Sequence, residues 1–322
     1  MALRNENITR RWQGLVGLST ALGLALLLST TSFPNSGEAA TVNTLAQQSS
    51  SKVKNYAPQE PSYLVVETQG ETLLAHNEQA RKAPASVTKL LTGLVAMGKV
   101  KGEDLVTVGD EVKLEGASLN LAPGDQIAVK DLLTAMYSIS ANDAASALAV
   151  KASGSIAAFA QEMNAYAYNL GCTNSHFVNP HGLSDPEHYT TASDYLKIVR
   201  AFMGNQELMH YVGQKQAEIT WKDKNGRVKR AKLRNTNELL GIYPGDQGIK
   251  TGTTEEAGEC LVTYVARPDG EIIVLLFGSQ HRYQDSIKLL DQGFAKLRTQ
   301  AALKTTAREP RLFSQSPGLF MP

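Results

Sequence analysis

The chain has 322 residues, of which 42% are hydrophobic and 20% are charged, and it contains 32 basic and 31 acidic residues. These values are typical of a globular chain with a sizeable core, organised as one large domain or two small ones. The formal net charge of +1 gives no electrostatic basis for binding a nucleic acid or an acidic membrane surface, and we expect no nucleic-acid partner.

The N-terminal segment has the pattern of an export signal. Three arginines within the first eleven residues precede an apolar stretch of fourteen, LVGLSTALGLALLL at 15–28. This stretch is shorter than the roughly 20 residues that span a membrane, and it has the length of a signal-peptide core. The cluster GEAA at 37–40 offers a cleavage site, whereas an anchor that stays uncleaved is the alternative. We therefore expect residues 1–40 to be a signal peptide or an N-terminal anchor.

Two further segments lack the periodicity of helices and strands. Residues 41–60 are rich in Ser, Gln and Pro, which is typical of a linker. Residues 301–322 follow neither a helical nor a strand period, which predicts a flexible tail. The folded domain is expected to cover residues 61–300.

Strand patterns lie at both ends of this domain. At its start, a Gln-Gly turn separates two alternating segments, SYLVVET and ETLLAHN, and predicts a β-hairpin. In its second half, an Asn-Gly turn separates AEITWKD from RVKRAKL and predicts another hairpin. Further strands are predicted by QGIKTGTT and ECLVTYVARPDGEIIVLLFGS, and a closing helix by RYQDSIKLLDQGFAKL.

The middle of the domain is mostly helical in pattern. A helix is predicted from about Ser86 to Met97, and much of residues 100–205 carries apolar residues three to four apart, as in VKDLLTAMYS and SIAAFAQEMNAYAYNLG. Strands around a helical middle predict an α/β (α+β) fold, in which one antiparallel sheet is built from both ends and a helical lobe, at about 101–205, packs beside it. Chemistry is expected in the cleft between lobe and sheet.

Three short motifs occur in an order that indicates nucleophilic catalysis. They are Ser86-x-x-Lys89, Ser140-Ala141-Asn142 and Lys250-Thr251-Gly252. Single matches carry little weight, because Ser-x-x-Lys also occurs twice in the linker and Ser-x-Asn occurs again at Ser118. In the predicted context, however, Ser86 opens a helix with Lys89 one turn further on the same face, and Lys250 lies on a strand. The three motifs together are the signature of serine β-lactamases and penicillin-binding proteins.

The similarity extends well beyond these motifs. PASVTKLLTG, SANDAASALA, GIKTGTTEEAG and the long segment FAQEMNAYAYNLGCTNSHFVNPHGLSDPEHYTTASDYLKI resemble the D-alanyl-D-alanine carboxypeptidase family, the low-molecular-mass penicillin-binding proteins. The resemblance covers nearly all of residues 62–297. It implies the penicilloyl-serine transferase (β-lactamase-like) fold, an antiparallel sheet flanked by helices plus a helical lobe.

This resemblance also implies an activity. We expect a serine-type D-Ala-D-Ala carboxypeptidase that removes the terminal D-alanine from peptidoglycan stem peptides and that β-lactam antibiotics inhibit covalently. No cofactor and no metal are expected. Such an enzyme would be exported across the cytoplasmic membrane to its periplasmic or cell-wall side, either soluble after signal cleavage or held by an N-terminal anchor.

Catalytic roles are expected for Ser86, Lys89, Ser140 and Lys250, and a substrate-binding role for Asn142. Ser86 is the expected nucleophile, and Lys89 is its expected base, kept neutral by burial and by the nearby cation of Lys250. Ser140 is expected to relay a proton between Lys250 and the departing amine. Asn142 is expected to hold the acyl-side amide of the substrate.

The remaining candidates are expected to bind the substrate. The negative charge that develops on the carbonyl oxygen would meet the backbone N–H groups of Ser86 and Thr253, although many relatives carry a histidine where this chain has Thr253. The carboxylate of the leaving D-alanine requires hydroxyl and cationic partners, for which Thr251 and Arg282 are the candidates. Gly252 would let the substrate backbone approach the strand closely.

Three other functions are compatible with the same motifs to different degrees. A class A β-lactamase would carry Glu-x-x-Leu-Asn between the second and third motifs, and this pattern is absent from the sequence. A DD-endopeptidase that cuts peptidoglycan cross-links would use the same residues, so it stays open as the alternative. A non-catalytic β-lactam sensor is disfavoured, because such sensors usually carry a membrane domain with several spans.

Histidines and cysteines give weaker indications. His176 and His188 do not form the patterns of zinc carboxypeptidases, and His181 in NPHGL is expected to be structural. Cys172 and Cys260 are the only cysteines. In an exported chain they could form a disulfide, but their apolar surroundings favour two buried free thiols.

Overall fold

A computed structural model of the chain describes residues 60–68 and 70–308, with side chains up to residue 304. The predicted signal segment, nearly all of the predicted linker and residues 309–322 lie outside the described residues. Along the part of the chain that is described, we find no helix that is both long and apolar enough to cross a membrane.

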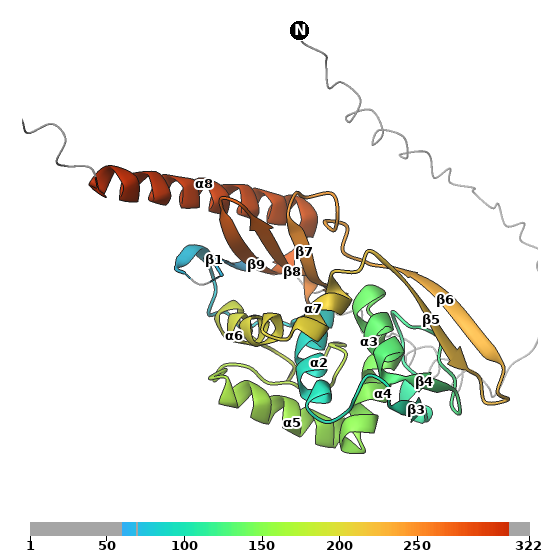
Figure 1. Cartoon of the computed structure of the whole chain (residues 1–322). Helices are drawn as coiled ribbons and strands as arrows, with labels where there is room; N and C mark the ends of the chain where they lie inside the picture. Colours follow the sequence, from blue (N-terminus) through green and yellow to red (C-terminus); the bar gives the residue numbers. More distant parts are fainter. Residues whose placement is uncertain (1–59, 69, 309–322) are drawn as a thin grey trace, which may run out of the picture. The chain divides into compact units, whose positions relative to one another are not determined.

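The larger sheet is built from both ends of the described chain, which confirms the prediction (Figure 1). Its five strands are antiparallel and lie in the order β2-β1-β9-β8-β7. The strands are β1 (Ser62–Glu67), β2 (Thr72–His76), β7 (Asp246–Thr254), β8 (Gly258–Arg267) and β9 (Gly270–Ser279). Because β1 pairs with β9, the N-terminal hairpin extends the C-terminal strands and leaves β7 as an edge strand.

Both faces of this sheet are covered, which explains the continuous apolar run of β9. Alternate residues of the run, such as Val274 and Leu276, belong to the cluster with Leu290 and Phe294 of α8 (Arg282–Arg308). The residues between them belong to the larger core that contains the helical lobe. Figure 1 shows α8 lying across the sheet. This helix extends to Arg308, beyond the predicted end of the domain at residue 300.

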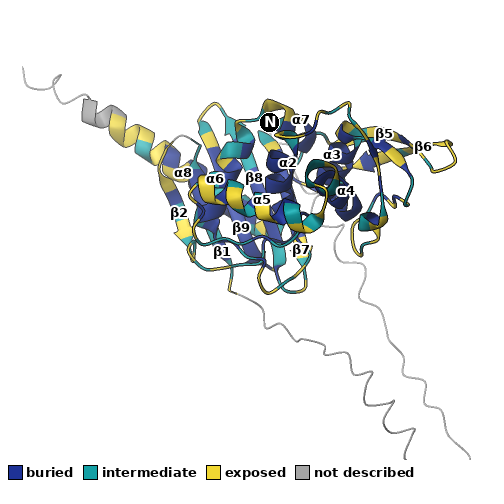
Figure 2. Cartoon of the chain, turned by 90° about the horizontal axis from the view of Figure 1, so that it is seen from below, coloured by how far each residue is buried: buried dark blue, intermediate teal, exposed yellow. Residues whose placement is uncertain are grey.

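The helical lobe packs around one central helix, α2 (Lys89–Met97), whose residues are buried from Lys89 to Ala96. The surrounding helices are α3 (Val129–Ser138), α4 (Asn142–Ser153), α5 (Ile156–Asn169), α6 (Ala192–Met203) and α7 (Gln206–Val212). In Figure 2 the exposed residues of α5 lie on its outer face, whereas α2 lies inside. An apolar helix such as α2 is stable only when it is buried on all sides.

A second sheet was not predicted. It has four strands in the order β3-β4-β5-β6 and includes the predicted hairpin, β5 (Gln216–Lys222) and β6 (Val228–Arg234). The other two strands, β3 (Leu105–Thr107) and β4 (Gln126–Ala128), with the short turn η2 (Asp110–Val112), occupy a region that was predicted to be mostly helical. Three-residue strands are too short to show an alternating pattern, so pairing with β5 rather than local sequence decides them.

The two cysteines are free and buried. Cys172 follows α5, and Cys260 lies on β8 opposite Gly252 of the edge strand. The disulfide alternative is therefore not realised in this structure.

Candidate active site

Ser86 lies on a strained turn, whereas the sequence predicts that it opens an α-helix. The turn is the 3-10 helix η1 (Ala85–Thr88), and α2 begins only at Lys89. Ala85 has a φ of +47°, a left-handed conformation that a residue with a side chain rarely adopts. Such strain persists only where the surroundings hold it, and it is common at functional sites.

The loop that contains NPHGL holds this turn from outside. A side chain at Gly182 is impossible, because a Cβ atom there would lie 1.8 Å from the carbonyl oxygen of Ala85. Asn179 fixes the loop, since its Oδ1 accepts hydrogen bonds from the backbone N–H groups of His181 and Gly182 at 3.3 and 2.7 Å. The loop is therefore part of the site through its backbone.

Lys89 is fully buried, and its amine contacts three oxygen atoms. Its Nζ lies 2.9 Å from Ser86 Oγ, 2.8 Å from Asn142 Oδ1 and 2.6 Å from the carbonyl oxygen of His181. Desolvation, followed by the charge of Lys250, holds the pKa of Lys89 well below its usual value. A lysine with a lowered pKa beside a hydroxyl can accept a proton at neutral pH.

Asn142 is the first residue of α4 and is held by the protein on two sides. Its Oδ1 accepts from Lys89, and its Nδ2 donates to the carbonyl oxygen of Glu115 at 2.8 Å. One N–H of the amide is thereby left for another acceptor.

Ser140, the first residue of the same motif, adopts a left-handed conformation with a φ of +62°. Its Oγ is buried, and within residues 60–68 and 70–308 it has no hydrogen-bond partner. A buried hydroxyl without a partner is costly, so it requires an explanation such as a proton-relay role.

Lys250 is buried on β7, where its Nζ donates to the carbonyl oxygen of Thr251 at 3.1 Å. Desolvation and then the charge of Arg282 lower the pKa of Lys250 to about 7. At neutral pH this amine can therefore both give and take a proton.

Gly252 allows the edge strand to approach the turn that carries Ser86. A Cβ atom at Gly252 would lie 2.9 Å from the backbone nitrogen of Ser86 and 3.0 Å from the Cβ of Ala85. The glycine was predicted to admit a substrate backbone. In the structure, the contact that excludes a side chain is made by the protein itself.

Thr251 and Thr253 flank this glycine. Thr251 Oγ1 shares a hydrogen bond of 2.9 Å with Thr236 Oγ1, from the segment that follows β6. Thr253 is exposed on the edge strand, and its Oγ1 accepts a hydrogen bond from Arg282.

Arg282 lies at the site, but its guanidinium is engaged by the protein. It donates to the carbonyl oxygens of Gly252 and Cys260 at 2.9 and 3.3 Å, and it forms an ion pair with Glu259 at 3.2 Å. Its side chain is only 11% exposed. In this arrangement Arg282 supports the edge strand, and direct binding of a substrate carboxylate stays a prediction.

His188 is a part of the site that the sequence did not reveal. The backbone N–H of Val178 donates to its Nδ1 at 3.1 Å, so its Nε2 carries the proton and donates to Thr88 Oγ1 at 2.9 Å. Thr88 Oγ1 in turn donates to the carbonyl oxygen of Ala85 at 2.8 Å. This chain of bonds fixes the strained residue before Ser86. In the sequence His188 lies in the segment EHYTT, which matches no motif of known function, so the sequence alone did not predict this role.

Replacing His188 with glutamine is expected to weaken the acid sensitivity of the fold. Burial lowers the pKa of His188 to about 4 from an ordinary 6.5. As the pH falls below about 6.5, His188 binds a proton in the unfolded chain but stays neutral in the folded chain. The free energy of unfolding therefore decreases as the pH drops towards 4. Between pH 7 and pH 5 this histidine should cost about 2 kcal/mol of unfolding free energy.

The measurement is urea unfolding of both proteins at pH 7 and pH 5. The loss between the two pH values should be about 2 kcal/mol smaller for His188→Gln than for the wild type. Equal losses in the two proteins would contradict the neutral, buried state assigned to His188.

Metal ligation is not indicated by the described residues. Among them, no three His, Cys, Asp or Glu side chains come together in a way that could hold a metal ion. His176, for example, bonds the carbonyl oxygen of Glu187 at 2.6 Å through its Nδ1.

Comparisons with known proteins agree with this geometry. The family model described as D-alanyl-D-alanine carboxypeptidase matches residues 47–281. The chain is 32% identical to the D-alanyl-D-alanine carboxypeptidase DacF of Bacillus subtilis over 271 residues, which make up 80% of this chain and 68% of that relative. It is 35% identical to DacC of Escherichia coli over 254 residues, or 74% of this chain and 62% of the relative. The chain thus spans about two thirds of the length of these relatives.

A solved structure gives the same result for the fold. The DD-transpeptidase of Streptomyces K15 superposes with a TM-score of 0.69 at 29% identity, covering 72% of this chain and 96% of that one. The prediction of a penicilloyl-serine transferase fold is confirmed by this likeness. With its motifs, its fold and the family match over residues 47–281, the chain belongs to the D-alanyl-D-alanine carboxypeptidase family.

Proposed function

We propose that this chain is a serine-type D-Ala-D-Ala carboxypeptidase that removes the terminal D-alanine from peptidoglycan stem peptides through an acyl-enzyme on Ser86. The observation that carries the proposal is the buried amine of Lys89, whose Nζ lies 2.9 Å from Ser86 Oγ and whose pKa is lowered by burial and by Lys250. Serine and lysine in this relation form a nucleophile with its base.

The hydrogen bonds of Lys89 support a neutral amine. Two of its contacts, Asn142 Oδ1 and the carbonyl oxygen of His181, can only accept, so they take the two N–H bonds of a neutral amine. Its lone pair then faces Ser86 Oγ, which donates its proton. As Ser86 Oγ forms a bond to the carbonyl carbon of the penultimate D-alanine, that proton passes to Lys89.

The leaving amine requires a proton when the peptide bond breaks. Lys250, with a pKa of about 7, and the unpartnered hydroxyl of Ser140 are the groups that we propose to deliver it. Free D-alanine then departs, and a water molecule attacks the ester on Ser86, releasing the shortened stem peptide and restoring the serine. We assign the developing negative charge on the carbonyl oxygen to the backbone N–H groups of Ser86 and Thr253.

β-Lactam antibiotics would acylate Ser86 by the same route, because their strained amide presents a carbonyl carbon to the same hydroxyl. The enzyme would act on the periplasmic or cell-wall side of the membrane, directed there by the predicted signal peptide or N-terminal anchor in residues 1–40. No cofactor enters any step of this scheme.

Digestion of cross-linked peptidoglycan by the purified chain should distinguish the two peptidase activities. Loss of one terminal alanine from pentapeptides, with cross-linked dimers untouched, is expected for a carboxypeptidase, and masses of the released muropeptides provide the measurement. Conversion of dimers to monomers would instead identify a DD-endopeptidase and overturn the first choice. Ser86→Ala serves as the matched control and should leave both products absent.

A further inference from the structure

Positive charge is concentrated on one hairpin of a chain whose other residues carry more acidic than basic groups. The 20 residues from Lys215 to Arg234, which span β5 and β6, include eight basic and only two acidic residues, in a chain whose net charge is +1. The eight are Lys215, Lys222, Lys224, Arg227, Lys229, Arg230, Lys232 and Arg234, and the two are Glu218 and Asp223. Figures 1 and 2 show this hairpin projecting beside the helical lobe.

Three of these cations share the outward face of β6. Arg230, Lys232 and Arg234 alternate with residues that face the protein and are themselves exposed, whereas Leu233 is buried between two of them. Residues two apart on a strand lie about 7 Å apart, so the three form a row of about 14 Å. Below we call these three residues the basic row.

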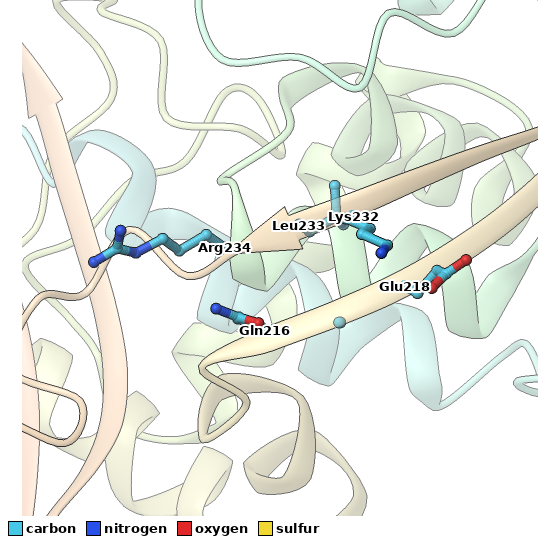
Figure 3. A pocket seen from close by; sticks show the side chains of 6 residues that line it. Gln216, Glu218, Lys232, Leu233 and Arg234 are labelled. Atoms are coloured by element: carbon cyan, nitrogen blue, oxygen red, sulfur yellow. The ribbon is translucent and has the colours of Figure 1, made fainter.

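Two members of the basic row, Lys232 and Arg234, line a shallow hollow of about 460 Å³ (Figure 3). The hollow is lined by Gln216, Ala217 and Glu218 of β5 and by Lys232, Leu233 and Arg234 of β6. Glu218 lies opposite Lys232 and is the one acidic residue in this lining. The surface therefore combines a concave shape with a net positive charge.

Ion pairing within the described residues does not neutralise the basic row. Salt bridges hold several basic side chains elsewhere, such as Lys99 to Glu162 and Lys130 to Glu103, but none of the salt bridges between described residues includes a member of the row. Across the hairpin Lys232 faces Glu218, whereas Arg230 faces Thr220 and Arg234 faces Gln216, so two of the three cations have no charged partner on β5. Their charge is therefore available to an anionic ligand.

The row leads directly to the site. Arg234 ends β6 and is followed by Asn235, whose Nδ2 donates to the carbonyl oxygens of Val212 and Gln214 at 3.2 and 2.9 Å. The next residue, Thr236, shares the hydrogen bond of 2.9 Å with Thr251 of the third motif. A polymer bound along the row would thus approach the site at the end where Thr251 lies.

We propose that the basic row binds carboxylates of the peptidoglycan strand outside the stem peptide that is being cleaved. The proposal rests on the proposed function, since every stem peptide of that substrate that has not donated its end to a cross-link terminates in a carboxylate, and the polymer repeats this charge along its length. Arginine and lysine form charge-assisted hydrogen bonds with carboxylates. The row accordingly holds the polymer, while Ser86 acts on one of its ends.

The test is a triple variant, Arg230→Gln, Lys232→Gln and Arg234→Gln, in the full chain. A control variant, Lys101→Gln, Lys151→Gln and Lys304→Gln, removes the same charge at three other exposed lysines. The half-saturating concentration of insoluble peptidoglycan should rise about tenfold for the first variant at low salt, and the difference should shrink at high salt. Hydrolysis of a short soluble peptide ending in D-Ala-D-Ala should be equal in both variants, and equal losses with the two substrates would overturn the proposal.

Treatment of the peptidoglycan identifies the anion. Amidation of its carboxylates should weaken binding of the wild type to the level of the triple variant, whereas removal of phosphate polymers by hydrofluoric acid should change nothing. The proposal would be overturned if removal of the phosphate polymers weakened binding and amidation did not. It would also be overturned if the triple variant lost binding only to anionic lipid vesicles and not to peptidoglycan. Co-sedimentation with peptidoglycan measures binding to the basic row and does not require catalysis. A wild-type protein that binds peptidoglycan but cleaves no D-Ala-D-Ala peptide would therefore refute the proposed function without refuting the role of the row.

Discussion

Replacement of Ser86 by alanine should abolish covalent labelling of the chain by a penicillin. The hydroxyl of Ser86 is the proposed nucleophile, and without it no ester can form, so the loss should be complete rather than partial. The fold should persist, because the variant loses one hydrogen bond, to Lys89, with a net value of about 1 kcal/mol. Intact-protein mass spectrometry after incubation with a penicillin measures the adduct directly.

A second serine offers the matched control for this experiment. Ser118 belongs to the other Ser-x-Asn match, and its Oγ donates to Asp143 at 2.7 Å and not to Lys89, Asn142 or Lys250. Ser118→Ala should therefore be labelled like the wild type. An adduct that persists on Ser86→Ala, with an unchanged mass increment, would place the nucleophile elsewhere.

Replacement of Lys89 by methionine should slow acylation by about a thousandfold, which is within the range that a positioned general base contributes. Methionine has a similar length and suits the fully buried position, so the chain should still fold. What is lost is the group that accepts the proton of Ser86, together with the donor to Asn142 Oδ1 and the carbonyl oxygen of His181. The second-order rate of penicillin acylation at pH 7 is the quantity to measure.

Arginine at the same position separates the role of a base from that of a cation. The side chain introduced by Lys89→Arg would keep the positive charge and the donors, but a guanidinium does not deprotonate in proteins. We expect Lys89→Arg to be as slow as Lys89→Met. Near-normal acylation by the arginine variant would show that charge rather than proton acceptance is required.

The motifs and the individual strands of the main sheet could be predicted because both can be recognised in local sequence. The alternating segment SYLVVE and the apolar run EIIVLLFG are each typical of a strand. In the structure these strands, β1 and β9, pair with each other, as their positions at the two ends of the domain suggested. Ser86 and Lys89 are three residues apart, so any helical turn places their side chains on one face. The tertiary structure was not needed for either.

Other features were decided by contacts between segments that lie far apart in the chain. Lys89 and the carbonyl oxygen of His181 are 92 residues apart, and Thr88 and His188 are 100 apart, so no local pattern could pair them. The same holds for β3 and β4, which are strands because β5 pairs with β4.

By itself, the sequence determined which residues are the candidates for the chemistry, since the proposed nucleophile, the two lysines and the glycine were identified by their types and their order. Only the tertiary structure decided the electrostatics of the site. Burial beside a second cation lowers the pKa of Lys89, and burial lowers that of Lys250 to about 7, whereas engagement by Glu259 and two carbonyl oxygens occupies Arg282. Desolvation and charge proximity depend on how distant segments pack, and one-dimensional spacing does not record them.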